Sequence, residues 1–501
     1  MKKNRGGSDH SGSREQGQSV ANDTNLLASH PFGFWFWTGL VVLIPVYSWF
    51  LIHSDWLQRP PKPVGDGICY ESIGYSLYSG LGFFEDYQST EWRSLYGKDS
   101  AYADLLERSE QRVIPATGRP PVLPAMIATA YVFFDRTPSA FMWIRFGLGS
   151  CLALSGAMAA GMTALLLRHF TKSVTASFLG AMTTIGLAAS QNTLKEYITD
   201  FLTEPVALFF LQALITLVVI RWFRMRDVGA SRSANAEASI VSGIASGHMV
   251  TWRWAIPIGL SMGMTVLTRS MFVFWLPGLL CLQYLIERGT RGERLIWSTK
   301  VGGVCLIACM PWWIHNCVSL GRFMPLGTQG AVAMLGGYSD EAYRDMGNWS
   351  YEPELALRRA IKPRLLELAN DTDREIAVSQ EASVVLRKWV AANTAKLPSL
   401  FVMRAVTHWN PYNGKAALWK VLVVMGSIWV VLSYPGLRWW ILGLPVVSTL
   451  VVMGLYETGG RFLVPLYGHL FMLGGLSVGL VWNVSRPWFQ RYGLGGKRTL
   501  V

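Results

Sequence analysis

Ionisable side chains beside long apolar runs are the residues of this sequence whose types and spacing could do chemistry. Asp66 stands between two glycines in the segment PVGDGICYE, which follows the first long apolar run. Glycine on either side lets the backbone bend closely around a ligand. A carboxylate within hydrogen-bond reach of a hydroxyl can remove its proton. Asp66 is therefore a candidate base, although an isolated loop aspartate is more often only a turn residue.

A second group of polar residues, Tyr197, Asp200 and Glu204, marks the start of another apolar run. Their spacing of three and four residues predicts that they share one face of a helix. Two carboxylates one turn apart repel each other unless a cation lies between them. That cation is either a protein arginine or lysine, or a divalent metal such as magnesium or manganese held by Asp66, Asp200 or Glu204.

Three arginines, Arg119, Arg269 and Arg461, lie near the ends of apolar runs. Any one of them could cap a helix or extend along it to a lipid headgroup. Together they are typical of a phosphate site, because arginine can hold a phosphate with two parallel hydrogen bonds. At the rim of a membrane, that phosphate would belong to a lipid.

The elements that position these residues follow from composition. Hydrophobic residues make up 51% of the 501 residues and charged residues only 15%, which indicates a polytopic membrane protein. The net charge of +13 comes mostly from short loops, where it sets topology and argues against a nucleic-acid face. A span needs roughly 20 apolar residues. The candidate spans are 33–53, 139–167, 173–191, 198–222, 254–286, 301–318, 416–434, 438–456 and 462–484.

The long run 254–286 is interpreted as two short helices that meet near Arg269, which brings the count to about ten spans. With ten spans every short basic loop falls on one side, as the positive-inside rule requires. The sequence therefore predicts an all-α membrane helix bundle with Asp66 and the three arginines on the non-cytoplasmic side. The predicted regions are a disordered cytoplasmic tail at 1–30, a transmembrane domain at 31–484 with outer loops at 54–138 and 319–415, and a basic cytoplasmic tail at 485–501.

Both outer loops are predicted to contain helices. In the first, the spacing of Tyr70, Ile73 and Leu77 predicts a helix that begins beside Asp66. The second contains an amphipathic stretch at 353–396, in which apolar residues recur at helical spacing between charges. Such helices either lie along a bilayer surface or form a small helical layer outside the membrane.

Six segments, in order along the chain, resemble the GT-C glycosyltransferases, the membrane class that includes the protein O-mannosyltransferases and the aminoarabinose transferases of lipid A. The first resembles that family's first outer loop, in which an aspartate shortly precedes a tyrosine. Each motif is weak by itself, and the six together indicate the superfamily without naming the sugar. The segments are GDGICYESIGYSLYSGLGFF at 65–84, GRPPVLPAMIATAYVFF at 118–134, YITDFLTEPVALFF at 197–210, GLSMGMTVLTRSMFVFWLPGL at 259–279, PWWIHNCVSLGRFMPLGTQG at 311–330 and GGRFLVPLYGHL at 459–470.

The resemblance implies an enzyme of the inner (plasma) membrane, with 31–484 as its catalytic domain. It would move a sugar from a polyprenyl-phosphate donor to a hydroxyl acceptor on the non-cytoplasmic side. Asp66 would be the base, with Glu204 as a second catalytic residue near it. The donor phosphate would be bound by Arg269, Arg461, Arg119 and His315, and the substrates by Tyr70, Tyr197, Asp200 and Asn316.

The chemistry of such a donor suits this set of residues. The leaving phosphate is already a good anion, so it needs positive charge rather than an acid, and one displacement inverts the sugar. Gly67 follows Asp66 where protein mannosyltransferases carry a glutamate, which favours a lipid-linked or cell-envelope glycan over a protein acceptor. His315 stands where arginine is common in the family.

Two other functions stay open at this level. A transporter or flippase of lipid-linked sugars would also need arginines, but along a path through the bilayer. A non-catalytic envelope scaffold would keep the fold without needing Asp66, Glu204 and Arg461, all of which are present.

Overall fold

The structure is a computed structural model that describes residues 31–62, 65–97, 113–234, 243–409, 414–433 and 436–491. Most of these residues are helical, and the predicted all-α membrane bundle is confirmed. The number of spans stays a prediction. The predicted tail at 1–30 lies outside the described residues, as does the predicted tail at 485–501 beyond Arg491, where the last helix ends.

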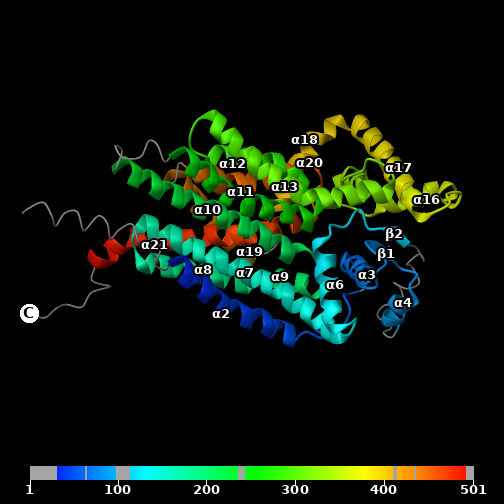
Figure 1. The fold of residues 1–501 in the computed structure, drawn as a ribbon, viewed down its shortest axis with the longest axis horizontal. Coiled ribbons are helices and arrows are strands. Elements are labelled where there is room, and N and C mark those ends of the chain that lie inside the picture. Colours follow the sequence, from blue (N-terminus) through cyan, green and yellow to red (C-terminus); the bar gives the residue numbers. More distant parts are fainter. Residues whose placement is uncertain are drawn as a thin grey trace, which may run out of the picture.

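Long helices run side by side along the longest axis of the molecule (Figure 1). Five helical segments of the described chain are long and apolar enough to cross a membrane, namely Pro31–Ile52, Pro138–Thr171, Glu204–Met225, Arg291–Leu320 and Arg461–Pro487. The chain is therefore a multi-pass integral membrane protein. The bundle helices are α2 (Pro31–Ile52), α7 (Pro138–Thr171), α8 (Val174–Ser190), α10 (Glu204–Ala234), α11 (Gly243–Thr268), α12 (Leu276–Ile286), α13 (Arg291–Leu320), α19 (Gly414–Ser433), α20 (Arg438–Gly454) and α21 (Tyr467–Arg491).

Small residues let the central helices approach closely, as they do at helix interfaces in membranes. A side chain on Gly39 of α2 would come within 2.8 Å of the Ala157 backbone in α7. A Cβ on Gly180 of α8 would lie 2.8 Å from the carbonyl oxygen of Gly475 in α21. Because α7 is rich in alanine and glycine, α2 and α8 pack along it, and most of its length is buried.

The predicted division of the run 254–286 is confirmed at Arg269. Helix α11 ends at Thr268, and the short 3-10 helix η3 (Ser270–Trp275) leads into α12. Arg269 has an extended backbone between the two elements. The break places Arg269 at the end of a helix pair, where its side chain, still mostly buried, pairs with Glu204.

The first outer segment folds into a small unit at one end of the bundle (Figure 1). The helix predicted beside Asp66 is confirmed as α3 (Gly67–Tyr78). Two features were not predicted. One is an antiparallel pair of short strands, β1 and β2. The other is the apolar helix α6, which at about 1.5 Å per residue is too short to span a membrane. The other elements are β1 (Phe84–Asp86), α4 (Thr90–Tyr96), β2 (Val113–Pro115), α6 (Val122–Phe134) and, further along the chain, α9 (Asn192–Thr199).

The second outer segment forms a helical layer whose apolar side chains pack against one another. Leu357 of α16 and Val378 of α17 join Val332 and Leu335 of α14 in one buried cluster. Arg358 of α16 binds both carboxylate oxygens of a glutamate in α17 at 3.0 and 3.2 Å. This packing favours the layer outside the membrane over helices lying on the bilayer. The elements are α14 (Gln329–Gly337), α15 (Asp340–Arg344), α16 (Glu352–Leu366), α17 (Asp371–Ala392), η4 (Thr394–Lys396), α18 (Leu397–Trp409) and, before α21, η5 (Arg461–Leu466).

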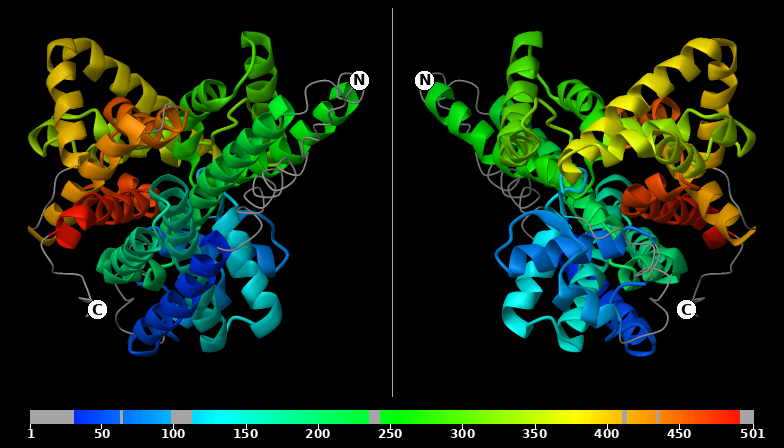
Figure 2. Two further views of the ribbon diagram at one scale, coloured as in Figure 1. Left: turned by 90° about the vertical axis from the view of Figure 1, so that its left-hand side faces the viewer. Right: turned by 90° about the vertical axis from the view of Figure 1, so that its right-hand side faces the viewer.

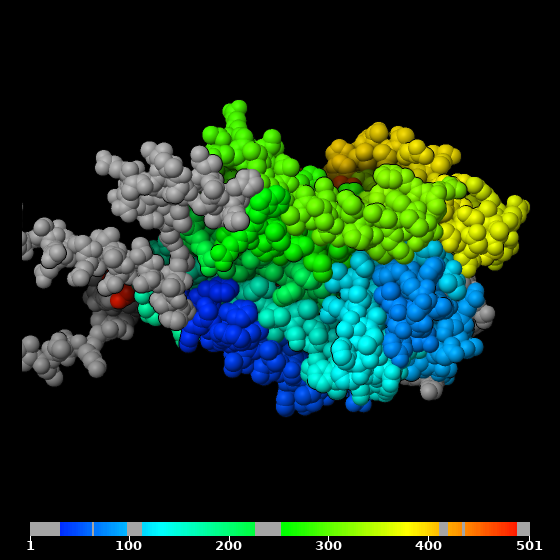
Figure 3. Space-filling view, in the orientation of Figure 1, coloured from blue at the N-terminus to red at the C-terminus, as the bar shows by residue number. Residues whose placement is uncertain are grey.

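The two outer segments meet at the same end of the molecule (Figure 3). The backbone N–H of Val113 in β2 donates to Asp371 at the start of α17, at 3.3 Å. Seen end-on, the N-terminal helices in blue and the second outer segment in yellow lie on opposite sides of the molecule (Figure 2). The end of the bundle between them holds the helix termini that carry the predicted site residues.

Candidate active site

The two glycines beside Asp66 have different structural roles. Gly65 has a φ of 87°, a left-handed conformation that favours glycine. Gly67 is the first residue of α3, and a Cβ there would collide with the carbonyl oxygen of Asp200. Asp66 precedes the helix as its N-cap, but its carboxylate makes no capping hydrogen bond. The carboxylate is therefore free to face other groups.

Glu204 is the first residue of α10, and its side chain is fully buried. The prediction that Tyr197, Asp200 and Glu204 share one face of a helix is wrong. Helix α9 ends at Thr199, and the chain breaks before α10, with Phe201 at a φ of 54°. Asp200 instead pairs with Lys62 at 3.0 Å. The break separates the two carboxylates and points them at different cations.

Five predicted residues come together as an arginine–carboxylate cluster, made of Asp66, Arg119, Glu204, Arg269 and Arg461. Arg119 Nη1 lies 2.7 Å from Asp66 Oδ1, and Arg461 Nη2 lies 3.1 Å from Asp66 Oδ2. Arg461 also binds Glu204 Oε1 through Nε, and Arg269 Nη1 lies 2.5 Å from the same oxygen. Arg461 therefore bridges the two carboxylates, which come from segments far apart in the sequence.

The charge balance of the arginine–carboxylate cluster favours an anion. Three guanidinium groups face two carboxylates, and Glu204 Oε2 and Arg119 Nε have no hydrogen-bond partner among the described residues. The side chains of Asp66 and Arg461 keep 27% and 26% of their exposure, whereas that of Glu204 keeps none. Asp66 and Arg461 are therefore partly open to solvent at the edge of the arginine–carboxylate cluster.

The arginines also control the protonation of Asp66. Burial by itself would raise the pKa of this carboxyl, but the charges of Arg119, Arg461 and Arg269 together hold its pKa below the usual value of 3.8. Asp66 is thus ionised at neutral pH, as a base must be. So low a pKa also makes it a weak base while these arginines face it.

Aromatic side chains line the same region. The Arg119 guanidinium lies 5.5 Å from the ring centre of Tyr70, and Arg269 lies 5.1 Å from that of Phe462. Burial raises the pKa of Tyr197, and Glu204 raises it further, so this tyrosine is close to the arginine–carboxylate cluster. Tyr456 was not predicted; burial raises the pKa of its hydroxyl, Arg269 lowers it and Asp66 raises it, so this tyrosine also lies close to the arginine–carboxylate cluster.

Two other predicted site residues make different contacts in the described part of the chain. His315 stacks on Trp312 with ring centres 5.2 Å apart and lies edge-on to Phe83. Asn316 is buried and donates to the carbonyl oxygen of Pro325 at 2.7 Å. Asn316 thus holds the turn after α13, and His315 belongs to an aromatic group rather than to the arginine–carboxylate cluster.

The carboxylates do not form a donor set for a divalent metal. Asp66 and Glu204 are each bound by two arginines, and Asp200 is paired with a lysine. Among the described residues no three histidine, cysteine, aspartate or glutamate side chains gather in a way that could hold an ion. Of the two cations left open by the sequence, the protein arginine is the one that faces Glu204.

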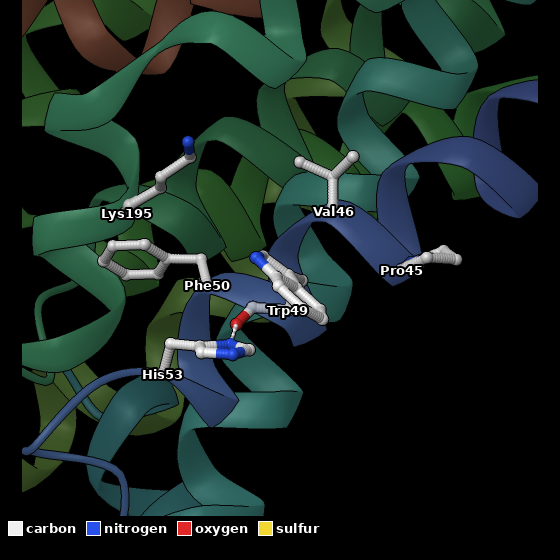
Figure 4. A pocket seen from close by; sticks show the side chains of 6 residues that line it. All are labelled: Pro45, Val46, Trp49, Phe50, His53 and Lys195. Atoms are coloured by element: carbon white, nitrogen blue, oxygen red, sulfur yellow. Dashed lines mark hydrogen bonds between the residues drawn. The ribbon is translucent and has the colours of Figure 1, made fainter.

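A groove elsewhere on the bundle contains none of the predicted site residues. It is open and lies between α2 and α9, where Trp49 and His53 face Lys195 across apolar side chains (Figure 4). His53 Nδ1 is 2.8 Å from the carbonyl oxygen of Trp49. In a membrane protein, an outward-facing groove of this composition suits contact with lipid.

Comparison with known proteins is informative only at the level of structure. No protein-family model matches the sequence, and no curated protein matches it significantly. An oligosaccharyltransferase from Archaeoglobus fulgidus, tethered to an acceptor peptide, matches with a TM-score of 0.50 and 11% identity over 93% of this chain and 52% of that one. The AglB oligosaccharyltransferase of the same organism, in complex with an inhibitory peptide and a dolichol-phosphate, gives 0.49 and 12% over 94% and 53%.

A further match is ArnT from Cupriavidus metallidurans bound to undecaprenyl phosphate, with a TM-score of 0.36 and 13% identity over 89% of this chain and 78% of that one. The chain spans about half the length of the archaeal oligosaccharyltransferases. At these sequence identities the similarity concerns the fold alone. The evidence for it is the peptide-tethered oligosaccharyltransferase, whose TM-score is 0.50. The chain thus shares the fold of about half of that archaeal oligosaccharyltransferase.

Proposed function

We propose that this protein is a glycosyltransferase that moves a sugar from a polyprenyl-phosphate donor to a hydroxyl acceptor. The observation that carries the proposal is the arginine–carboxylate cluster, in which one partly open carboxylate lies among three arginines. Such a site has an excess of positive charge for a phosphate and a base beside it. The fold and the position of the site at the ends of membrane helices support a lipid as the carrier of that phosphate.

In the proposed reaction Asp66 takes the proton of the acceptor hydroxyl while the oxygen of that hydroxyl attacks the anomeric carbon of the sugar. The bond from that carbon to the phosphate oxygen breaks, and the phosphodiester leaves as a phosphomonoester. Its negative charge therefore grows during the step. Arg461 and Arg269 are positioned to stabilise that growing charge, and no general acid is needed. A single displacement inverts the configuration of the sugar.

Binding of the donor phosphate would also change the basicity of Asp66, because Asp66 is ion-paired in the free protein. Arg119 and Arg461 each hold one oxygen of Asp66, and a bound phosphate competes for both. As the arginines turn to the phosphate, the pKa of Asp66 rises toward its ordinary value. Asp66 would thus become a better base only when the donor is bound.

Glu204 is best suited to hold arginines rather than to exchange protons. Its side chain is fully buried, and both of its cation contacts are on Oε1. Removal of its charge would leave Arg269 and Arg461 without their shared anchor. We therefore assign Glu204 to the positioning of Arg269 and Arg461, and keep the role of base for Asp66.

The acceptor that we favour is a lipid-linked or cell-envelope glycan on the non-cytoplasmic face of the inner membrane. The positive-inside pattern supports the side, and Gly67 after Asp66 supports a glycan over a protein. A flippase of lipid-linked sugars would need cations along a path through the bundle. The cluster residues instead come from helix termini and outer loops, which favours transfer at one face.

Mass spectrometry of envelope glycans from a strain that lacks the protein tests the proposal. A missing sugar would identify donor and acceptor together. Wild-type protein should restore it, and so should Asp55→Asn, which changes an exposed aspartate in the same outer loop. Asp66→Asn should not. Unchanged glycans in the deletion strain, or restoration by Asp66→Asn, would overturn the proposed activity or the proposed base, respectively.

A further inference from the structure

Arg145 is a buried cation outside the predicted set of site residues. It lies in α7, inside an apolar run, and its side chain has no solvent exposure. A guanidinium in such a place must be satisfied by hydrogen bonds or by an opposite charge. Its hydrogen bonds show which parts of the chain depend on it.

One Arg145 guanidinium binds carbonyl oxygens of two separate segments. It donates to Thr199 from Nε at 3.2 Å and from Nη2 at 2.8 Å. On the other segment it donates to Leu57 and Arg59 from Nη1, at 3.2 and 2.7 Å, and to Pro60 from Nη2 at 3.3 Å. The guanidinium also lies 4.6 Å from the ring centre of Phe201.

These two segments lead directly into the two carboxylates of the arginine–carboxylate cluster. Thr199 is the last residue of α9, just before the break that ends at Glu204. The carbonyls at 57–60 belong to the chain that enters Asp66. Two more contacts join the same segments, the ion pair between Lys62 and Asp200 and the close approach of Gly67 to Asp200. The side chain of Arg145 is fully buried, whereas those of Lys62 and Asp200 are partly exposed.

We propose that Arg145 is a positioning residue that sets the separation of Asp66 and Glu204 by holding both segments that lead into them. The proposal rests on the proposed transfer reaction, in which Arg461 must span these two carboxylates. Arginine suits the task because its planar fork presents five N–H donors in fixed directions, whereas lysine offers three from one point. Without the fork the two segments would separate, and Asp66 would shift relative to the donor.

The test uses Arg145→Gln and Arg145→Lys in the full-length protein. Arg221→Gln is the matched control, since Arg221 is also buried and pairs with Glu287 through Nη1 at 2.5 Å, 17 residues beyond Glu204 in α10. Initial rates are measured with a polyprenyl-phosphate sugar donor. A displacement of about 1 Å can lower a rate about 100-fold. We expect kcat to fall about 100-fold in Arg145→Gln, with a smaller fall in Arg145→Lys and little change in the donor KM of either variant.

A second readout does not depend on catalysis. Cys69 lies on α3 close to Asp66, with its sulfur 3.8 Å from Arg119 Nη2. In a protein whose other five cysteines are replaced by alanine, we expect Arg145→Gln to raise the rate of Cys69 labelling by a membrane-impermeant maleimide several-fold. Arg145→Lys should give an intermediate rate, and Arg221→Gln should leave the rate unchanged.

The two readouts separate the failure of this proposal from that of the proposed function. If the wild-type protein transfers no sugar but Arg145→Gln still exposes Cys69, the transfer reaction is wrong and the structural tie stands. If both Arg145 variants label Cys69 and turn over as Arg221→Gln does, Arg145 only stabilises the bundle, and the positioning role is refuted.

Discussion

Helix α3 carries a carboxylate at its N-terminus and another five residues further on, and the two meet arginines in opposite ways. Glu71 is completely buried and accepts five hydrogen bonds, from Trp92, Tyr96, Tyr131 and twice from Arg136, at 2.6 to 3.0 Å. Asp66 keeps a quarter of its exposure, and in the described part of the chain the three arginines of its cluster form ion pairs with Asp66 and Glu204.

The difference teaches how to separate a structural ion pair from a binding site. In the Glu71 pair both carboxylate oxygens have partners, and one positive charge meets one negative charge. In the arginine–carboxylate cluster positive charge is in excess, and polar atoms of Glu204 and Arg119 lack a partner among the described residues. A saturated pair stabilises one conformation, whereas an unsaturated one has capacity left for a ligand. Four predictions, taken from the largest expected effect to the smallest, test this contrast.

Asp66→Asn should abolish most of the activity and leave the fold intact. Loss of a positioned base lowers a rate by up to about 10⁴-fold, and we expect kcat to fall about 10³-fold. The unfolding temperature in detergent should fall less than that of Glu71→Gln, because the ion pairs of Asp66 are partly exposed and solvent weakens them. Full turnover by this variant would show that Asp66 is not the base.

Glu71→Gln should do the reverse. Breaking a buried ion pair leaves Arg136 unpaired and lowers the free energy of unfolding by about 3–5 kcal/mol. Burial by itself would raise the pKa of Glu71, but Arg136 and the donated hydrogen bonds hold it below its usual 4.5.

This lowered pKa gives the Glu71 pair a pH signature. A carboxylate with a lowered pKa in the folded protein stabilises it above pH 4.5, and that contribution is lost as the pH falls further. The wild-type protein should therefore lose stability in acid more steeply than Glu71→Gln. The kcat of correctly folded Glu71→Gln should match that of the wild type, and a specific loss of kcat at full folding would contradict the contrast.

Arg461→Ala should weaken donor binding more than it slows chemistry at saturation. A hydrogen bond to a charged group contributes about 1.5–3 kcal/mol, so we expect the donor KM to rise roughly 10- to 100-fold. Arg136→Ala removes the arginine of the saturated pair and is the matched control. It should lower the unfolding temperature and leave the donor KM unchanged. An unchanged KM in Arg461→Ala would remove this arginine from the phosphate site.

The pH dependence of the rate should reveal the competition for Asp66. In the free protein the pKa of Asp66 lies below 3.8, so kcat/KM should stay level as the pH falls to about 5. In the donor complex that pKa is higher, so kcat should decline at a higher pH than kcat/KM does. In Arg119→Gln the decline of kcat/KM should move up by about one pH unit, because one of the cations that lower the pKa is gone. If kcat and kcat/KM decline at the same acidic pH, the donor phosphate does not compete with Asp66 for its arginines.

Much of this protein could be predicted from its sequence. Apolar run lengths predicted the membrane bundle, and the polar interruption at Arg269 predicted a helix break. Because a charged side chain in or beside a membrane span carries a free-energy cost, Asp66, Glu204 and the arginines could be selected as candidates from the sequence. The same argument applied to Arg145, but a single arginine inside an apolar run gives no hint of its partners.

The failures lay where the local pattern was ambiguous. The spacing of Tyr197, Asp200 and Glu204 fits one helix, and nothing in it reveals that Phe201 adopts a left-handed conformation. His315 and Asn316 follow the family motif in position, but their side chains contact Trp312 and Pro325. The strands β1 and β2 are three residues each and pair across nearly thirty positions, too short for any periodic signal.

The sequence by itself determined which residues are costly to bury and that long apolar helices form a membrane bundle, because both depend on transfer between water and hydrocarbon one segment at a time. Only the tertiary structure decided which carboxylate meets which arginine. Arg461 reaches Asp66 across 395 positions, and Glu71 of α3 is matched with Arg136 in the turn between α6 and α7, 65 positions further along the chain. Pairing of this kind depends on distance and direction in three dimensions, which no local pattern of residues encodes.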